Sequence, residues 1–134
     1  MPVLQGRTPA DYLRCAREIA AVTNQWVNSY KRLVVGFEAP VYVSWARNNR
    51  SVVVNVPPIK AGKADSARIE FRAPDPSCNP YLAFSVVLAA GLRGVEEGYD
   101  LPPETLANLY QMTDEERLAE GISILPGSLA EALD

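Results

Sequence analysis

The sequence predicts an α+β fold in which a small antiparallel β-sheet forms a platform flanked by helices. Three segments in the middle of the chain are rich in β-branched and aromatic residues and are joined by short polar connections. The segments on either side place apolar residues three and four positions apart, which is typical of helices. At 134 residues, the chain is predicted to be a single segment, 1–134, with no internal domain boundary.

The first helix is predicted to begin at Thr8-Pro9, because threonine caps helices and proline suits the first turn. Apolar residues at helical spacing then give it one apolar face: Leu13, Ala16, Ile19 and Ala20. We expect the helix to end near residues 22–24. The polar pair Asn28-Ser29 then predicts a turn.

The sheet is predicted from residues 41–45, 51–56 and 67–72. The first two segments are expected to form a hairpin or near-hairpin across the polar residues 46–50, and Pro57-Pro58 ends the second. Alternation along the third segment turns its apolar side chains, Ile69 and Phe71, towards a core. Its charged side chains lie on the other face: Arg68, Glu70 and Arg72.

Capping residues predict where the later helices begin. Asn79-Pro80 predicts the start of a long helix over 81–96, which is apolar nearly all round and is therefore expected to be buried on more than one side. A short helix is predicted over 104–110, and a capping box at 113–116 begins another helix that ends near 120. A further capping box at 128–131 stands close to the end of the chain. It indicates that the chain is cut from something longer or frays at its C-terminus.

The composition excludes several classes of function. A net charge of −3 gives no basic field for nucleic acid, and no run of eighteen apolar residues could span a membrane. Two cysteines far apart in sequence form no disulfide framework, and we expect reduced thiols in a cytoplasm. With no histidine, a zinc site and Ser-His or Cys-His nucleophiles are not expected. If this chain contributes to catalysis, it does so through carboxylates, arginines and bound metal.

The charged row of the third strand is the first candidate site. The guanidinium groups of Arg68 and Arg72 could grip phosphate or carboxylate oxygens in pairs, and the carboxylate of Glu70 could hold a cation. The alternative is a surface strand joined by its own salt bridges. Glu38, in a loop before Pro40, would by itself be read as a solvated side chain.

Ordered sequence blocks resemble glutamine synthetase, and they run from about residue 13 to the C-terminus. They are Asn-Ser-Tyr-Lys-Arg-Leu-Val at 28–34, Gly-Phe-Glu-Ala-Pro-Val at 36–41, Asn-Arg-Ser at 49–51, Arg-Ile-Glu-Phe-Arg-Ala-Pro-Asp-Pro at 68–76 and Asn-Pro-Tyr-Leu at 79–82. The tail over 108–129 resembles the bacterial type I branch. The resemblance implies the C-terminal part of a guanido-kinase-like catalytic domain, with the N-terminal β-grasp domain and the first part of the catalytic domain absent.

The resemblance also implies an activity, the ATP-dependent ligation of ammonia to L-glutamate through γ-glutamyl phosphate. Arg32 matches an arginine that holds a carboxylate of glutamate, and Arg72 matches one that stabilises bound glutamate and its γ-phosphate. Glu38 matches the acid of a flap that closes over glutamate and helps to deprotonate ammonium.

The phosphate side of the site is implied in the same way. Arg50 matches an arginine on the transferred phosphoryl group, Arg68 matches one on the ATP phosphates, and Glu70 matches a ligand of the bridging Mg²⁺ or Mn²⁺. In two places the chain departs from the family pattern. Val35 replaces the usual proline before the flap, and Asn55 replaces a further phosphate-region arginine. The second departure puts the strength of nucleotide binding in question.

The family forms its sites between subunits of a dodecameric ring, so the resemblance implies a homo-oligomer and an incomplete site in the chain alone. Two alternatives stay open. One is a γ-glutamyl-amine ligase that uses an amine other than ammonia. The other is a non-catalytic, glutamine synthetase-like assembly module, which Asn55 favours and the retained charged residues oppose.

Overall fold

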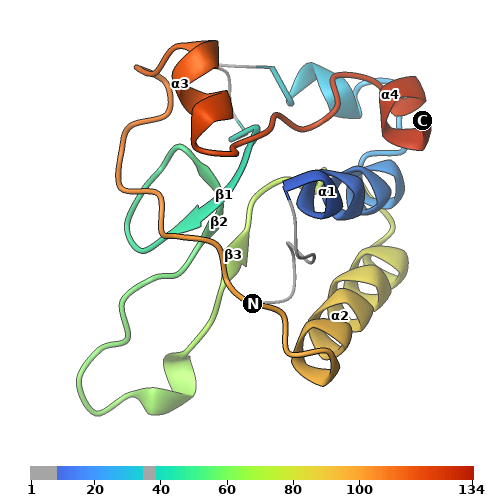
Figure 1. The fold of residues 1–134 in the computed structure, drawn as a ribbon. Helices are drawn as coiled ribbons and strands as arrows, with labels where there is room; N and C mark the ends of the chain where they lie inside the picture. Colours follow the sequence, from blue (N-terminus) through green and yellow to red (C-terminus); the bar gives the residue numbers. More distant parts are fainter. Residues whose placement is uncertain (1–8, 35–38) are drawn as a thin grey trace.

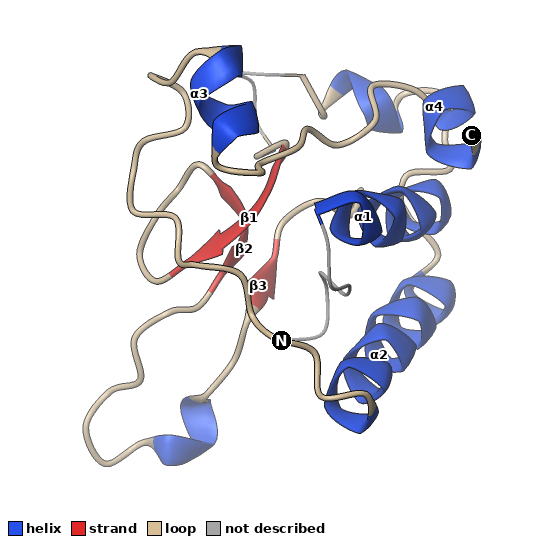
Figure 2. Cartoon of the chain, in the orientation of Figure 1, coloured by secondary structure: helices blue, strands red, loops and turns tan. Residues whose placement is uncertain are grey.

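The computed structural model describes residues 9–34 and 39–134, and it has an α+β architecture. A three-stranded sheet lies beside two longer helices, α1 (Pro9–Thr23) and α2 (Pro80–Glu96) (Figures 1 and 2). The C-terminal part of the chain carries two short helices, α3 (Asp114–Ala119) and α4 (Leu129–Leu133). α1 spans Pro9–Thr23, which confirms the first predicted helix. A 3-10 helix, η1, spans Ser29–Lys31 at the predicted turn.

The sheet has the order β1-β2-β3 and is mixed. β1 (Tyr42–Ala46) pairs with β2 (Val52–Asn55) in parallel, whereas β3 (Glu70–Phe71) pairs with β2 in the antiparallel sense. The first two predicted strands are confirmed, and the third, predicted over 67–72, is a strand only at Glu70–Phe71. The predicted hairpin and the wholly antiparallel platform are wrong. Residues 47–51 turn the chain back to the start of β1, with Asn48 in the left-handed region at φ 63°. The backbone N–H of Asn48 donates to Asn55 Oδ1 at 3.2 Å and fastens this connection to the end of β2.

The outer edge of β1 is covered by segments that come much later in the chain. Val43 N–H donates to Ser123 O at 2.8 Å, and Thr105 N–H donates to Trp45 O at 3.0 Å. The Asn49 amide donates to the carbonyl oxygens of Thr105 and Ala107, each at 2.9 Å. The predicted helix over 104–110 is therefore wrong. Hydrogen bonds to β1 and to Asn49 hold residues 104–107 in an irregular conformation along the edge of the sheet.

Both faces of β1 and β2 are buried. Every residue of β1 is buried, as are the three valines of β2. Helix α1 packs against β1, α2 and α4, and its residues Ala16 and Ile19 belong to the same core. A long connection leaves β2, forms the 3-10 helix η2 (Ala64–Ser66) and returns to β3.

Helix α2 spans Pro80–Glu96, and the predicted cap is confirmed. Asn79 Oδ1 accepts the backbone N–H groups of Tyr81 and Leu82, at 3.0 and 3.3 Å. Gly98 ends the helix at φ 61°, a conformation that glycine adopts without strain. Only Ala90 of α2 is buried, so the prediction that this helix is buried on more than one side is wrong for this chain.

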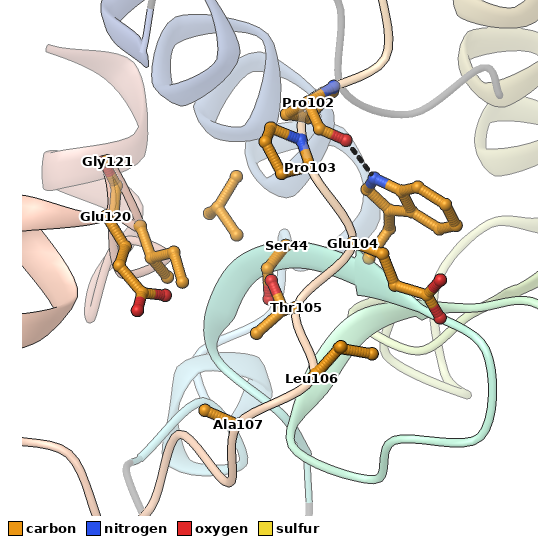
Figure 3. Close-up of a pocket in the computed structure, with 13 residues that line it drawn as sticks. Ser44, Pro102, Pro103, Glu104, Thr105, Leu106, Ala107, Glu120 and Gly121 are labelled. Atoms are coloured by element: carbon orange, nitrogen blue, oxygen red, sulfur yellow. Dashed lines mark hydrogen bonds between the residues drawn. The ribbon is translucent and has the colours of Figure 1, made fainter.

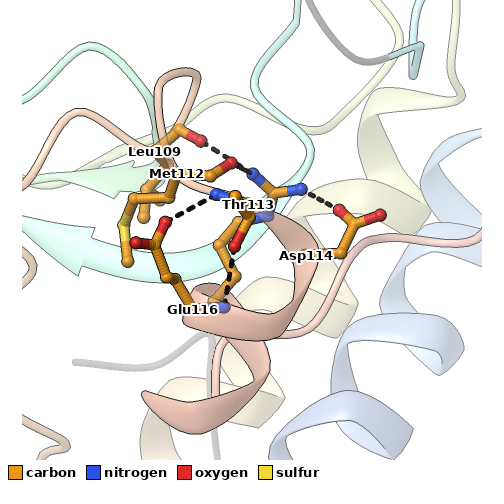
Figure 4. Close-up of polar contacts among 6 residues, drawn as sticks. Leu109, Met112, Thr113, Asp114 and Glu116 are labelled. Atoms are coloured by element: carbon orange, nitrogen blue, oxygen red, sulfur yellow. Dashed lines mark hydrogen bonds and ion pairs between the residues drawn. The ribbon is translucent and has the colours of Figure 1, made fainter.

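The two C-terminal helices are short. α3 (Asp114–Ala119) has the predicted capping box between Thr113 and Glu116 (Figure 4). The buried Arg117 guanidinium donates to the carbonyl oxygens of Leu109 and Met112 and pairs with Asp114. α4 (Leu129–Leu133) is capped by the Ser128 hydroxyl. In the described part of the chain, no helix has the length and apolar character needed to cross a membrane.

Candidate functional site

The candidate site lies along β3 and the loops beside it. Ile69 and Phe71 pack against the core, as alternation predicts. The backbone N–H of Arg72 donates to Val53 O at 3.0 Å, which holds Arg72 beside β2 just beyond the end of β3. Its guanidinium Nη1 donates to the carbonyl oxygen of Arg50 at 2.6 Å. This bond brings Arg50 and Arg72, which are 22 residues apart in sequence, together.

Glu70 is held at both carboxylate oxygens. Asn55 Nδ2 donates to Glu70 Oε2 at 3.0 Å, and Arg68 Nη2 donates to Glu70 Oε1 at 3.2 Å. The Asn55 bond is the main cause that lowers the pKa of Glu70 below its ordinary value, and Arg68 adds to it. The carboxylate is therefore charged and fixed in direction at neutral pH. Asn55, the departure from the family pattern, orders this part of the site.

Arg32 approaches from η1. Its Nη1 donates to the carbonyl oxygen of Pro74 at 3.2 Å, two residues after Arg72. The next residue, Asp75, is buried, and its Oδ1 accepts the backbone N–H of Ser77 at 2.8 Å. A hydrogen bond from the Ser29 side chain is the first cause that lowers the pKa of Asp75, and the bond from Ser77 is the second. Asp75 thus ties η1, which precedes Arg32, to the segment that follows Arg72.

Glu70 could bind a divalent metal only together with other ligands. Among the side chains that the structure describes, no group of three or more acidic, histidine or cysteine residues could hold a metal ion. A carboxylate has about four lone-pair positions, so Glu70 keeps acceptor capacity beyond its two hydrogen bonds. Mg²⁺ commonly takes one or two carboxylates together with substrate phosphates, and Glu70 suits that role.

Two cavities lie beside the sheet. One of about 590 Å³ is lined by Arg50, Tyr110 and the connection over 47–51. The other, of about 520 Å³, lies between β1 and the loops over 102–107 and 120–123 (Figure 3). There the Trp45 indole N–H donates to Pro102 O at 2.7 Å. This second cavity is lined by none of the residues predicted for the site, so the chemistry implied by the sequence is not located there.

The structure joins the predicted residues in three contacts: Arg72 with Arg50, Arg68 with Glu70, and Arg32 with the chain just after Arg72. Glu38 lies outside the described residues. Sequence reasoning missed Asp75 and the bond from Asn55 to Glu70. The Asp-Pro-Ser order at 75–77 is a signal that could have found the first, since aspartate often accepts the N–H two residues on.

Comparison with known proteins identifies the family. A family model described as "Glutamine synthetase, catalytic domain" matches residues 9–134. The chain is 57% identical to a glutamine synthetase of Mycolicibacterium smegmatis over 125 residues, which are 93% of this chain and 28% of that relative. It is 52% identical to one of Thermotoga maritima over 122 residues, 91% of this chain and 27% of the relative. It is also 50% identical to one of Methanocaldococcus jannaschii over 125 residues, 93% of this chain and 27% of the relative.

The chain thus spans somewhat more than a quarter of the length of these relatives. The match nevertheless covers nearly the whole chain, including β2, β3 and the charged row along β3. The chain belongs to the glutamine synthetase catalytic domain family.

Proposed function

We propose that this chain is the C-terminal portion of a glutamine synthetase catalytic domain and supplies one wall of the site that ligates ammonia to L-glutamate. The observation that supports this is the set of contacts along β3, which fixes Glu70 between Asn55 and Arg68 and holds the Arg72 guanidinium on the backbone carbonyl of Arg50. The relatives bear the name glutamine synthetase, and the charged residues occur in matched sequence. The complete domain is guanido-kinase-like in this proposal and works in a cytoplasmic homo-oligomer, a dodecamer as the resemblance implies.

The first step is phosphoryl transfer. A carboxylate oxygen of glutamate attacks the γ-phosphorus of ATP, the bond from that phosphorus to the bridging oxygen breaks, and ADP leaves. Arg50 and Arg68 neutralise the phosphoryl oxygens, while Arg32 and Arg72 orient glutamate. This chemistry needs positioning and charge stabilisation more than a covalent group of the protein, which suits a wall of the site that carries no histidine.

When bound at Glu70, Mg²⁺ or Mn²⁺ would neutralise part of the negative charge on the ATP phosphates. The hydrogen bonds that lower the pKa of Glu70 favour its ionised form, which is the form that binds a cation. In the second step, ammonia attacks the acyl carbon of γ-glutamyl phosphate and inorganic phosphate leaves, which gives glutamine. Glu38 is proposed to take a proton from ammonium and to help exclude water from the acyl phosphate.

Replacing a segment in a relative tests this function. The aligned 125 residues of the M. smegmatis enzyme are exchanged for the matching residues of this chain, and phosphate release is measured with ATP, Mg²⁺, glutamate and ammonium. We expect ammonium-dependent turnover that falls roughly 10²–10³-fold in Glu70→Gln. The matched control Glu115→Gln, on the exposed face of α3, should leave turnover unchanged.

The two alternatives give different results in the same assay. Turnover with another amine but not with ammonium would select a γ-glutamyl-amine ligase. ATP binding without turnover would select the non-catalytic assembly module. The 134-residue chain alone is expected to show no turnover, and measurable synthesis by it would contradict the proposal that it carries one wall only.

A further inference from the structure

The cavity between β1 and the loops over 102–107 and 120–123 is not used by the proposed chemistry. Its volume of about 520 Å³ falls within the range of small-molecule sites in proteins, about 300–1,000 Å³. Most of its lining is apolar, and the apolar side chains that line it are Val43, Trp45, Pro102, Pro103, Leu106 and Ile122. A ligand with a compact apolar body therefore fits inside it.

Hydrogen bonds hold the walls of this cavity to β1. The backbone N–H of Thr105 donates to Trp45 O at 3.0 Å. The backbone N–H of Val43 donates to Ser123 O at 2.8 Å. The Trp45 indole N–H donates to Pro102 O at 2.7 Å, which the dashed line in Figure 3 marks. Both loops are thus bonded to the same strand, and the cavity is formed before any ligand enters.

A buried hydroxyl group without a partner lines the cavity. Thr105 is 7% exposed, and its backbone groups bond to Trp45 and Asn49. Its hydroxyl, by contrast, meets no hydrogen-bond partner in the part of the chain that the structure describes. Because the large majority of buried polar side chains in proteins are hydrogen-bonded, this hydroxyl marks a place where an atom from outside the chain completes the site.

Two carboxylates give the cavity a negative charge. Glu104 and Glu120 line it, and Figure 3 shows them on opposite sides. Glu104 is already bonded to Arg47, whose backbone N–H and Nη1 donate to its two oxygens at 2.6 and 3.0 Å. Among the described residues, Glu120 has no ion-pair partner, and no lysine or arginine lines the cavity. The uncompensated charge of Glu120 attracts a cation and repels carboxylates and phosphates.

We propose that this cavity binds a small organic amine, in its protonated form, that carries a second polar group. The ammonium group pairs with the Glu120 carboxylate, and the second polar group bonds to the Thr105 hydroxyl. The apolar body of the amine lies against Trp45 and Ile122. The tryptophan ring also attracts the positive charge, since the face of an indole ring is electron-rich. The inference depends on neither the catalytic roles nor the reaction proposed above.

Calorimetry with tyramine as the probe tests this proposal. Tyramine joins an ammonium group to an apolar ring that carries a hydroxyl group. It is titrated into the 134-residue chain and into the segment-exchanged M. smegmatis enzyme, in the absence of ATP and glutamate. We expect both proteins to bind it with a Kd of about 1 mM or tighter. The anionic analogue 3-(4-hydroxyphenyl)propionate should bind at least about tenfold more weakly, because its carboxylate meets Glu104 and Glu120.

Substitutions in the cavity give the second measurement. Glu120→Gln should weaken tyramine binding about tenfold, because the ammonium group loses a charged partner. Thr105→Val keeps the shape of the side chain, removes the hydroxyl and should weaken binding roughly threefold. The matched control Glu115→Gln removes the same charge from α3 but does not line the cavity, so it should leave binding unchanged. Circular dichroism checks that each variant is folded, and Glu120 is exposed, so its replacement should not disturb the fold.

Several results would overturn the proposal. Tyramine might fail to bind the isolated chain, or it might bind no better than its anionic analogue. Binding that Glu120→Gln leaves unchanged would place the amine outside this cavity. Binding to the isolated chain but not to the exchanged enzyme would show that the rest of the enzyme fills the cavity, and the proposal would be wrong. Turnover enters none of these measurements, so they can fail while the proposed function holds.

Discussion

Replacing Asp75 with asparagine should destabilise the chain by removing a buried carboxylate that joins distant segments. Asp75 is 7% exposed, and it accepts hydrogen bonds from the Ser77 backbone and the Ser29 side chain. Asparagine offers one acceptor oxygen in place of two and turns an amide group towards these donors. Hydrogen bonds to charged groups contribute about 1.5–3 kcal/mol each. We expect the free energy of unfolding at pH 7 to fall by about 2 kcal/mol, and the midpoint temperature by roughly 5–10 °C.

The loss should depend on pH in a defined direction. The pKa of Asp75 is lowered in the folded chain, so this carboxylate stabilises the fold fully above its unfolded pKa of about 3.9. That contribution disappears as the pH falls through the folded pKa, because the protonated group no longer gains from its donors as a charge. The difference between the original chain and Asp75→Asn should therefore be full at pH 7 and narrow steadily below about pH 4.

Urea unfolding followed by circular dichroism, repeated from pH 7 down to pH 3, measures this difference. Asp65→Asn is the matched control, because Asp65 is exposed in η2 and its replacement should cost less than about 0.5 kcal/mol. The reasoning is refuted if Asp75→Asn matches the original chain at pH 7. It is refuted equally if the loss has the same size at pH 3 as at pH 7, since the charge would then play no part.

Two further substitutions probe the other polar contacts. Asn55→Ala should raise the pKa of Glu70, because it removes the bond that contributes most to lowering it. A ¹³C NMR titration of the Glu70 carboxyl measures this pKa, and an unchanged value would contradict the leading role given to Asn55. Arg117→Met should lower the free energy of unfolding by about 2–3 kcal/mol, because two backbone carbonyl groups lose a charged donor. Urea unfolding measures this loss, and a chain of unaltered stability would contradict the role given to the buried guanidinium.

The sequence alone determined the features that depend on near neighbours. The cap at Asn79, the capping box at 113–116 and the stop at Gly98 are all made by groups within a few residues of one another. Alternation likewise placed Ile69 and Phe71 on the core side, because side-chain direction in an extended chain is a local property. The order of charged blocks was also enough to identify the family, while the site roles of Arg50, Arg68, Glu70 and Arg72 stay predictions.

Only the tertiary structure decided how distant segments meet. The parallel pairing of β1 and β2 depends on the return of residues 47–51, and the irregular chain over 104–107 depends on bonds to β1 and Asn49. Local propensity cannot report the partners of the segment over 104–107, because they are supplied by residues about 56–58 positions away. It also cannot tell whether two neighbouring strands pair in the parallel or the antiparallel sense. Sequence reasoning missed the hydrogen bond from Asn55 to Glu70 because the fold brings these two residues together from different strands. It also expected α2 to be buried on more than one side, whereas the tertiary structure leaves one face of this helix exposed.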